Sequence, residues 1–262
     1  LVPCMKCEDC QKGNYSLCRH YSFIGSREFG SFAEYVLVPE KNVCKFSEKV
    51  SFEQGALFEP ATVALHGLER LNYRGGGTVA ILGGGTIGMF VMQWAKIYGA
   101  RKVVVFDIAK ERLELGRRLG ADGGINTLDA DFMDQAMAMT DGRGFDYVYE
   151  TAGNVITMKM AFRLAANKAQ VCFVGTPTKE LSFSVEDWEN INRKEFTLTG
   201  SWMSYSAPFP GHEWSAAAHY FETGELKTDD SFIFKKMPLK DIAEAFELYR
   251  TPGSFKGKIL ID

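Results

Sequence analysis

Hydrophobic and polar positions follow a repeating pattern from Thr78 onward. Residues 78–82 form a short apolar run, as in a buried strand, and residues 89–99 then carry apolar side chains at helical spacing. A second apolar run over 102–106 completes a strand–helix–strand unit, whose two strands we expect to be parallel.

The same alternation continues beyond this unit. It predicts helices over 109–119, 131–140 and 155–166, and strands over 124–126, 146–150, 170–174 and 196–199. Six parallel strands with helices between them make a doubly wound α/β sheet. In such a sheet, ligands bind at the carboxyl ends of the strands.

The segment before this sheet has a different pattern. Residues 30–38 alternate and carry β-branched and aromatic side chains, which predicts a strand that ends at Pro39. Ser51 begins a helical stretch with an acidic first turn. Because a proline interrupts the hydrogen bonds of a helix, we expect Pro60 to kink or divide this stretch.

The segment after the sheet is again different. Beyond Trp202 the chain is rich in turn residues over 205–214, and helical spacing returns over 215–222 and 241–249. The chain closes on an apolar run over 258–261, which predicts a strand that returns to the first lobe.

A glycine-rich loop lies between the first predicted strand and helix of the sheet. Gly83, Gly85 and Gly88 match the pattern G-x-G-x-x-G, in which the first glycine permits a tight turn, the second admits a pyrophosphate and the third allows close packing. The phosphates would face the positive end of the helix. The alternative is that these glycines serve only a tight turn.

Asp107 supports the nucleotide interpretation of this loop. It ends the second predicted strand, nineteen residues after Gly88, near the spacing expected for a carboxylate that accepts hydrogen bonds from the adenosine ribose. A carboxylate at this position would repel a 2′-phosphate, so we expect NAD rather than NADP as the cofactor.

Four thiols lie in the first eighteen residues: Cys4, Cys7, Cys10 and Cys18. Four thiolates fill the tetrahedral shell of Zn²⁺ and leave no position for water, so we expect a structural zinc site. Disulfides and buried free thiols are the alternatives. The chain opens without the basic and apolar segments of a secretory signal, so we expect a cytoplasmic protein whose reduced thiols favour the metal.

The remaining candidate metal ligands have simpler interpretations. His20 lies beside the last thiol of the cluster, but four thiolates already complete the shell, so we expect a surface residue. Cys44 and Cys172 lie in apolar stretches, and we expect each to be a small hydrophobic core residue.

Composition and charge exclude two classes of partner. The 262 residues are 46% hydrophobic and carry a net charge of −3, so there is no overall positive field to attract nucleic acid. Lys6, Lys12 and Arg19 near the thiols are balanced by Glu8 and Asp9, which argues against a zinc-ribbon nucleic-acid binder. No stretch approaches the ~20 apolar residues of a membrane span.

These features together resemble the medium-chain zinc-dependent alcohol and polyol dehydrogenases. The resemblance covers the whole chain. Besides the cysteine cluster and the glycine loop, it is carried by residues 21–27, 30–35, 58–63, 150–153, 200–206 and 210–214.

The resemblance implies a Rossmann domain and a GroES-like β-rich domain that carries the structural zinc lobe. We expect residues 1–62 to be part of the GroES-like catalytic domain, 63–205 to be the NAD-binding domain and 206–262 to return to the catalytic domain. Since the chain begins at Leu1, close to the first thiol, we expect a fragment that lacks roughly 90 N-terminal residues and hence has an incomplete GroES-like domain.

The family also has a catalytic zinc, held by a cysteine, a His-Glu pair and a glutamate in the Glu-Pro segment. Only the glutamate has a counterpart here, Glu59, which the resemblance makes the catalytic and metal-binding candidate. Gly211-His212-Glu213 repeats the tripeptide of the family, but it lies after the nucleotide-binding unit, and we expect a surface turn there.

The activity implied is transfer of a hydride from a secondary alcohol of a polyol or polyol phosphate to NAD⁺, with the catalytic zinc of the complete protein as Lewis acid. With one ligand of that zinc left, we expect residues 1–262 to be inactive. The resemblance therefore also implies a small-molecule substrate. The residues implied for cofactor binding are Gly83, Gly85, Thr86, Ile87, Gly88, Asp107, Arg112, Thr151, Ala152, Val174, Gly175 and Thr176.

Three further expectations accompany this activity. The predicted strand over 196–199 would be a sheet edge that pairs across a two-fold axis, giving a homodimer or homotetramer. A substrate phosphate needs a cation, for which Arg27 and Lys256 are the candidates, and the alternative for each is a solvated surface charge. The alternatives within this interpretation are an enzyme like sorbitol or threonine dehydrogenase and a non-catalytic NAD-binding protein with a structural zinc.

Overall fold

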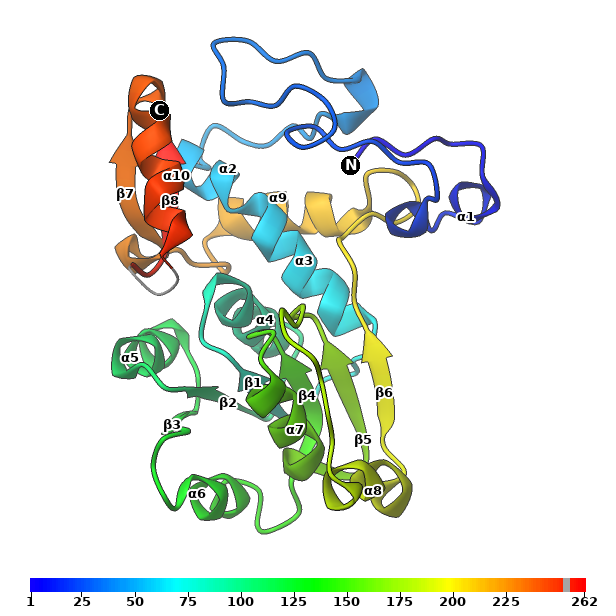
Figure 1. The fold of residues 1–262 in the computed structure, drawn as a ribbon, viewed down its shortest axis with the longest axis vertical. Helices are drawn as coiled ribbons and strands as arrows, with labels where there is room; N and C mark the ends of the chain where they lie inside the picture. The colour runs from blue at the N-terminus through cyan, green and yellow to red at the C-terminus, as the bar shows by residue number, and fades with distance from the viewer. Residues whose placement is uncertain (252–254) are drawn as a thin grey trace. The chain divides into compact units, whose positions relative to one another are not determined.

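The computed structural model describes residues 1–251 and 255–262, and the chain forms two compact units. Unit 1 contains Leu1–Thr62 and Met203–Asp262, whereas unit 2 contains Val63–Trp202. The boundary between them falls inside one helix, α3 (Phe58–Glu69), drawn in cyan in Figure 1. Each unit is described by itself below.

Unit 2 is built on the six-stranded sheet that the sequence predicts. The strand order is β3-β2-β1-β4-β5-β6, and every neighbouring pair is parallel. This order reverses between β1 and β4, as in a doubly wound fold. The strands are β1 (Thr78–Leu82), β2 (Lys102–Asp107), β3 (Gly123–Asn126), β4 (Phe145–Glu150), β5 (Ala165–Phe173) and β6 (Thr197–Gly200).

Helices connect these strands, as Figure 1 shows. They are α4 (Thr86–Ile97), α5 (Lys110–Leu119), α6 (Phe132–Ala138), α7 (Val155–Leu164) and α8 (Val185–Lys194). All except α8 match predicted helices. Asp187 is the only fully buried residue of α8, so hydrophobic periodicity gives no signal there, although Ser184 caps the helix by accepting a hydrogen bond from the Asp187 N–H.

The core of unit 2 explains why its strands are continuous apolar runs. All five residues of β1 are buried, because a parallel sheet is covered on both faces. Aromatic rings fill the space between sheet and helices: Phe106 meets Phe145 at 5.7 Å between ring centroids, and Phe162 meets Phe196 at 5.1 Å.

Unit 1 combines short helices with a two-stranded parallel sheet. Its sheet pairs β7 (Ile233–Met237) with β8 (Lys258–Ile261), the strand predicted at the end of the chain. β7 is not among the predicted elements. The helices that lie wholly in unit 1 are α1 (Glu8–Gln11), α2 (Phe52–Ala56), α9 (His212–Thr223) and α10 (Ile242–Arg250), with 3-10 turns at Tyr15–Leu17, Glu40–Asn42, Asp230–Phe232 and Leu239–Asp241.

The helical stretch predicted from Ser51 is divided, as expected. Ser51 and Gln54 form a reciprocal capping box at the start of α2. The division falls at Leu57, and Pro60 lies in the first turn of α3, where a missing N–H removes no intrahelical hydrogen bond.

The strand predicted over residues 30–38 is wrong. These residues form bends and extended chain with no strand assignment, and Tyr35 and Leu37 are 92% and 94% exposed. A strand needs a neighbour to satisfy its backbone hydrogen bonds, and no described residue pairs with this segment. Alternation alone does not show whether a partner is present.

Among residues 1–251 and 255–262, no helix has the length and hydrophobicity needed to cross a membrane.

A buried ion pair joins α7 to α8. Asp187 has 4% of its side chain exposed, and its Oδ1 lies 2.8 Å from Arg163 Nε and 2.7 Å from Arg163 Nη2. Burial alone would raise the pKa of Asp187, but hydrogen bonds from Arg163 and Ser184 outweigh it and hold this pKa below its usual value. The ionised carboxylate therefore stabilises the fold.

We expect Asp187→Asn to lower the free energy of unfolding by about 1–2 kcal/mol near pH 7, since Arg163 is half exposed and keeps part of its hydration. Because the pKa of Asp187 is lower in the folded than in the unfolded state, its carboxylate stabilises the fold at pH values above the unfolded-state pKa. This stabilisation is lost as the pH falls through the folded-state pKa. Urea unfolding from pH 7 to pH 4 should show the difference between wild type and variant narrowing toward low pH.

Glu189→Gln is the matched control, because Glu189 pairs with Arg193 at 2.8 Å on the exposed face of the same helix. It should change stability by less than about 0.5 kcal/mol. A difference for Asp187→Asn that stays constant with pH would contradict the electrostatic explanation.

Candidate cofactor and metal sites

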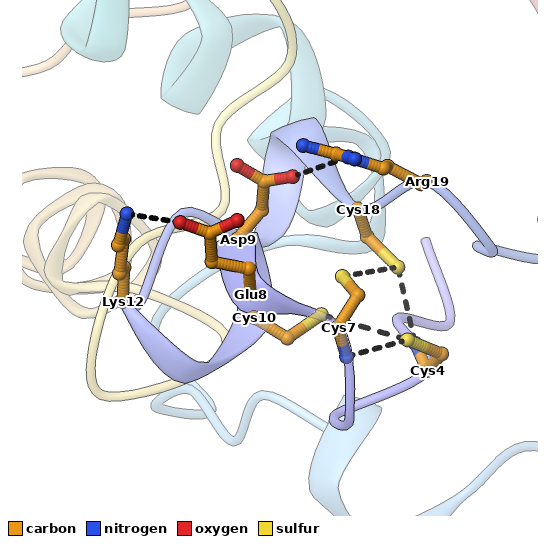
Figure 2. Close-up of polar contacts among 8 residues, drawn as sticks. All are labelled: Cys4, Cys7, Glu8, Asp9, Cys10, Lys12, Cys18 and Arg19. Carbon is orange, nitrogen blue, oxygen red and sulfur yellow. Dashed lines mark hydrogen bonds and ion pairs between the residues drawn. The ribbon is translucent and has the colours of Figure 1, made fainter.

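The four N-terminal thiols converge on one point in unit 1, as Figure 2 shows. Cys4 and Cys7 precede α1, Cys10 lies within it and Cys18 follows the next 3-10 turn. The Sγ atoms of Cys4 and Cys10 are 4.0 Å apart, and those of Cys7 and Cys18 are 3.9 Å apart. Four sulfurs around a tetrahedral Zn²⁺ lie about 3.8 Å from one another, so the cluster fits this metal.

The surroundings of the thiols favour negative charge unequally. Backbone N–H groups of Cys10 and Arg19 lower the pKa of Cys7 to about 6, whereas burial raises the pKa of Cys10 to about 12. The N–H groups of Cys4 and Cys7 also point at sulfur, at 3.3 Å from Cys18 Sγ and 3.4 Å from Cys4 Sγ respectively. A divalent cation would supply the remaining positive charge that four thiolates need.

A distant segment of unit 1 holds the cysteine lobe in place. The buried Ser16 accepts a hydrogen bond from the Tyr205 N–H at 3.0 Å and donates one to the Tyr205 carbonyl at 3.3 Å. The ring of Tyr15 meets Phe209 edge-on at 5.3 Å. The segment around Tyr205, singled out in the sequence as a mark of the family resemblance, therefore supports the metal lobe.

The other predicted thiol and imidazole environments are mostly confirmed. His20 is exposed and lies outside the cluster. Cys172 is fully buried in β5, and burial raises its pKa to about 12, as expected for a core residue. Cys44 is only half-buried, so it is not the core residue that the apolar surroundings predict.

Two of the three motif glycines are required by the fold of the nucleotide loop. Gly83 has a φ of +104°, and its N–H donates to the Phe106 carbonyl at 2.8 Å. At Gly88 a Cβ would lie 1.9 Å from the Gly83 carbonyl oxygen. Neither position accepts a side chain, whatever the loop binds.

Gly85 is different, because the fold itself does not require a glycine there. Its φ of −75° suits any residue, and a Cβ would meet no atom within 4 Å. Gly85 is the N-cap of α4, so this open space lies at the positive end of a twelve-residue helix. The space that a Cβ would fill is one that a phosphate group can occupy.

Asp107 is tied to this loop. Its Oδ2 accepts hydrogen bonds from the Gly84 N–H at 2.7 Å and from Arg112 Nη1 at 3.3 Å, and its Oδ1 accepts one from the Ala109 N–H at 2.8 Å. A carboxylate has about four acceptor positions, so about one remains on Oδ1. The side chain of Asp107 is only 5% exposed, whereas that of Arg112 is 37% exposed.

The loops after β4 and β5 pack against each other beside Gly83. The hydroxyl of Thr151 donates to the Gly83 carbonyl at 2.9 Å. A Cβ on Gly153 would lie 2.6 Å from the Thr176 carbonyl oxygen, and one on Gly175 would lie 2.2 Å from the Gly153 nitrogen. Residues 151–153 and 174–176 thus form one surface at the carboxyl edge of the sheet.

The structure therefore brings the predicted cofactor residues together along one edge of unit 2. They follow the carboxyl ends of β1, β2, β4 and β5: Gly83, Gly85, Thr86, Ile87, Gly88, Asp107, Arg112, Thr151, Ala152, Val174, Gly175 and Thr176.

Glu150 is a site residue that the sequence interpretation missed. It ends β4, is fully buried, and its Oε1 accepts hydrogen bonds from the Ala152 and Gly153 N–H groups, both at 3.0 Å, and from the Thr157 hydroxyl at 2.7 Å. Burial raises the pKa of Glu150, and these hydrogen bonds oppose the shift. The sequence signal was a carboxylate directly after the apolar residues 147–149, at the carboxyl end of a predicted strand.

Glu59 does not form part of a metal centre with the other described residues. It lies in the first turn of α3 and is exposed, yet partial desolvation of its carboxylate raises its pKa while the charge of Lys258 opposes the shift. No group of three potential ligands among residues 1–251 and 255–262 includes Glu59. The residues present therefore do not fit the catalytic zinc of the family.

Gly211-His212-Glu213 does not form the surface turn that was expected. His212 begins α9, and Glu213 is fully buried, with its Oε2 accepting a hydrogen bond from the Ser206 hydroxyl at 2.6 Å. The carboxylate of Glu213 therefore serves the packing of unit 1.

We expect Cys10→Ser to reduce the bound zinc from about one per chain to well below one, and to lower Tm by about 5 °C or more, because a tetrahedral site loses a buried ligand. Zinc analysis of the purified protein and thermal unfolding check both effects. Cys44→Ser, at a half-buried thiol outside the cluster, should retain the metal. Full zinc content in Cys10→Ser would contradict the four-thiolate site.

Comparison with known proteins supports the resemblance. The family description "Zinc-binding dehydrogenase" matches residues 86–222, and "Alcohol dehydrogenase GroES-like domain" matches residues 1–48. Galactitol 1-phosphate 5-dehydrogenase of Escherichia coli K12 is 38% identical over 100% of this chain and 75% of its own length. D-arabitol-phosphate dehydrogenase of Enterococcus avium is 31% identical over 93% of this chain and 68% of its own length.

Solved structures agree with these sequence matches. The crystal structure of galactitol-1-phosphate dehydrogenase from Escherichia coli has a TM-score of 0.92 at 35% identity, covering 100% of this chain and 75% of that one. The crystal structure of a zinc-binding dehydrogenase from Sinorhizobium meliloti bound to NADP has a TM-score of 0.85 at 30% identity. The match covers 99% of this chain and 74% of that one. The chain therefore belongs to the zinc-type medium-chain alcohol dehydrogenase family, with a Rossmann sheet and a GroES-like domain.

Proposed function

We propose that this protein is a NAD-dependent dehydrogenase that oxidises a secondary alcohol of a polyol phosphate, with galactitol 1-phosphate as the reference substrate. The relatives named for polyol phosphates support the substrate class. The observation that carries the cofactor assignment is the empty space at Gly85, which the fold leaves open at the N-terminus of α4.

In this proposal the pyrophosphate of NAD lies over residues 83–88. The α4 N–H groups and the helix dipole stabilise its charge. The remaining acceptor position of Asp107 receives a ribose hydroxyl, and the same carboxylate disfavours the 2′-phosphate of NADP. Arg112 holds Asp107 in place, since its Nη1 already lies 3.3 Å from that carboxylate.

The nicotinamide half lies against Thr151, Ala152 and residues 174–176. Bound NAD⁺ supplies the hydride acceptor. Glu150 is a positioning residue here: its side chain fixes the loop after β4, and its carbonyl accepts the Val174 and Gly175 N–H groups at 2.9 Å each. One buried residue thus orients both loops.

The metal assignments differ between the two sites. The four thiolates hold a structural zinc that stabilises the lobe. We assign no reaction step to a zinc at Glu59, and we propose that residues 1–262 alone bind NAD without oxidising a polyol. Residues 1–62 and 206–262 belong in this proposal to the GroES-like domain, and residues 63–205 to the NAD-binding domain.

The setting of the protein follows the same reasoning. Among the described residues all six cysteines are free, which favours a reducing compartment such as the cytoplasm. β6 is the edge strand of the sheet, and we propose that it pairs with β6 of a second copy in a homodimer or homotetramer.

Arg27 donates to the Tyr21 carbonyl at 2.7 Å and lies over its ring, so we assign it no role with a substrate phosphate.

Calorimetric titration of NAD into three proteins tests the cofactor site. We expect Gly85→Ala to weaken NAD binding by about tenfold or more and to change Tm by less than about 2 °C, because its Cβ clashes only with the ligand. Gly88→Ala should instead destabilise the fold itself, since its Cβ would meet the Gly83 carbonyl.

Unchanged NAD affinity in Gly85→Ala, or the absence of NAD binding by the wild type, would overturn the cofactor assignment. NADP binding as tight as NAD would overturn the role given to Asp107. Assays of residues 1–262 with galactitol 1-phosphate, galactitol, sorbitol and L-threonine complete the test. We expect no turnover, and oxidation of the phosphorylated polyol would support the substrate class while contradicting the inactivity.

A further inference from the structure

A cavity lies at the end of the unit 2 sheet opposite to the nucleotide loop. It has a volume of about 560 Å³ and lies at the amino ends of β1, β2, β4 and β5. In a parallel sheet these ends are separated from the carboxyl ends by the length of the strands, so the cavity is distinct from the nucleotide loop. The lining residues that matter here are Thr78, Arg101, Arg143, Asp146, Arg163 and Lys194.

The lining of this cavity is strongly positive. Four cationic side chains face it against one carboxylate, although the whole chain carries a net charge of −3. The carboxylate, Asp146, is already engaged, because its Oδ2 accepts hydrogen bonds from the Thr78 N–H at 2.7 Å and the Thr78 hydroxyl at 2.9 Å. It therefore neutralises none of the four cations directly.

Two of the cations are fixed by the protein and keep unused donors. Lys194 Nζ donates to the carbonyls of Phe162 at 3.0 Å and Arg163 at 2.8 Å, which leaves one N–H. Burial lowers the pKa of Lys194, so an anion beside it would stabilise its charged form. Arg163 binds Asp187 through Nε and Nη2, which leaves Nη1 available.

The other two cations, Arg101 and Arg143, make no contact that would explain their presence as structural residues. Lysines at this edge stabilise helix ends, as Lys194 does for α7, but neither arginine bonds to a backbone carbonyl. Within residues 1–251 and 255–262, the Arg101 side chain has no hydrogen-bond or ion-pair partner, and Arg143 has only the exposed Asp141, at 3.8 Å. Among the described residues, Arg163 is therefore the one cation of the four with a close carboxylate partner, Asp187 at 2.7 Å.

We propose that this cavity binds a small molecule that carries two or more linked phosphate groups. Its volume lies within the range of about 300–1,000 Å³ typical of small-molecule sites. Arginine forks match phosphate oxygens in pairs, and the fixed donors of Arg163 and Lys194 can add charge-assisted hydrogen bonds. Arg101, Arg143 and Lys194, together with the unused Nη1 of Arg163, offer more donors than a single orthophosphate requires.

Titration of inorganic tripolyphosphate into the protein, followed by calorimetry at low ionic strength, tests this site. We expect the double variant Arg101→Gln/Arg143→Gln to bind tripolyphosphate about tenfold or more weakly, with its Tm in the absence of ligand unchanged, because both side chains are exposed. NAD binding should be unaffected by the double variant, which separates this site from the proposed cofactor site.

The matched control is Lys240→Gln/Arg250→Gln, which removes the same two charges from exposed positions of unit 1. Its affinity for tripolyphosphate should stay within about twofold of wild type. If both double variants bound tripolyphosphate equally weakly, the loss of affinity would follow from net charge alone. That result would overturn the proposed site.

Two further outcomes would also overturn the proposal. Tripolyphosphate binding that is lost in Gly85→Ala but kept in Arg101→Gln/Arg143→Gln would place the anion on the nucleotide loop. Orthophosphate binding as tightly as tripolyphosphate would exclude a site built for linked phosphates, as would the absence of any binding by the wild type.

Discussion

Parallel pairing of the six strands is the constraint on which both edges of unit 2 depend. Because every strand runs in the same direction, the residue that ends one apolar run lies beside the residue that ends the next. Gly83, Asp107 and Glu150 are far apart in sequence and meet at one edge for this reason. The same geometry gathers Arg101 and Arg143 at the other edge, so one topological fact creates two chemically different surfaces.

Strand pairing places these loops only approximately, and hydrogen bonds to the buried carboxylates of Asp107 and Glu150 fix their conformation. Asp107 and Glu150 each accept hydrogen bonds from N–H groups of loops that would otherwise be free to move. A buried carboxylate is costly unless such donors surround it, so the loops and the carboxylates stabilise one another. At the carboxyl ends of the strands, Asp107 and Glu150 therefore fix the backbone of the neighbouring loops whether or not a ligand is bound.

Local sequence signals predicted most of unit 2, and in unit 1 they predicted α2, α9, α10 and β8 but not β7 or the irregular N-terminal part. Strands buried on both faces are continuous apolar runs, and Gly83 and Gly88 occupy positions that the fold closes to any side chain. Residues 30–38 show the limit: they alternate like a strand, but a strand exists only where a partner satisfies its backbone. Helix α8 and Glu150 were missed because polar residues there act through tertiary hydrogen bonds, which leave no periodic signal.

The cysteine lobe depends on the same kind of long-range information. The spacing of its thiols predicted a metal cluster, yet nothing in that spacing indicates that Ser16 and Tyr15 rest on the segment around Tyr205 and Phe209. A metal crosslinks only the residues that ligate it, so the position of the lobe within unit 1 must come from these contacts. The segment that follows β6 in sequence therefore does for the metal lobe what Glu150 does for the cofactor loops: it sets the orientation of a site to which it contributes no ligand.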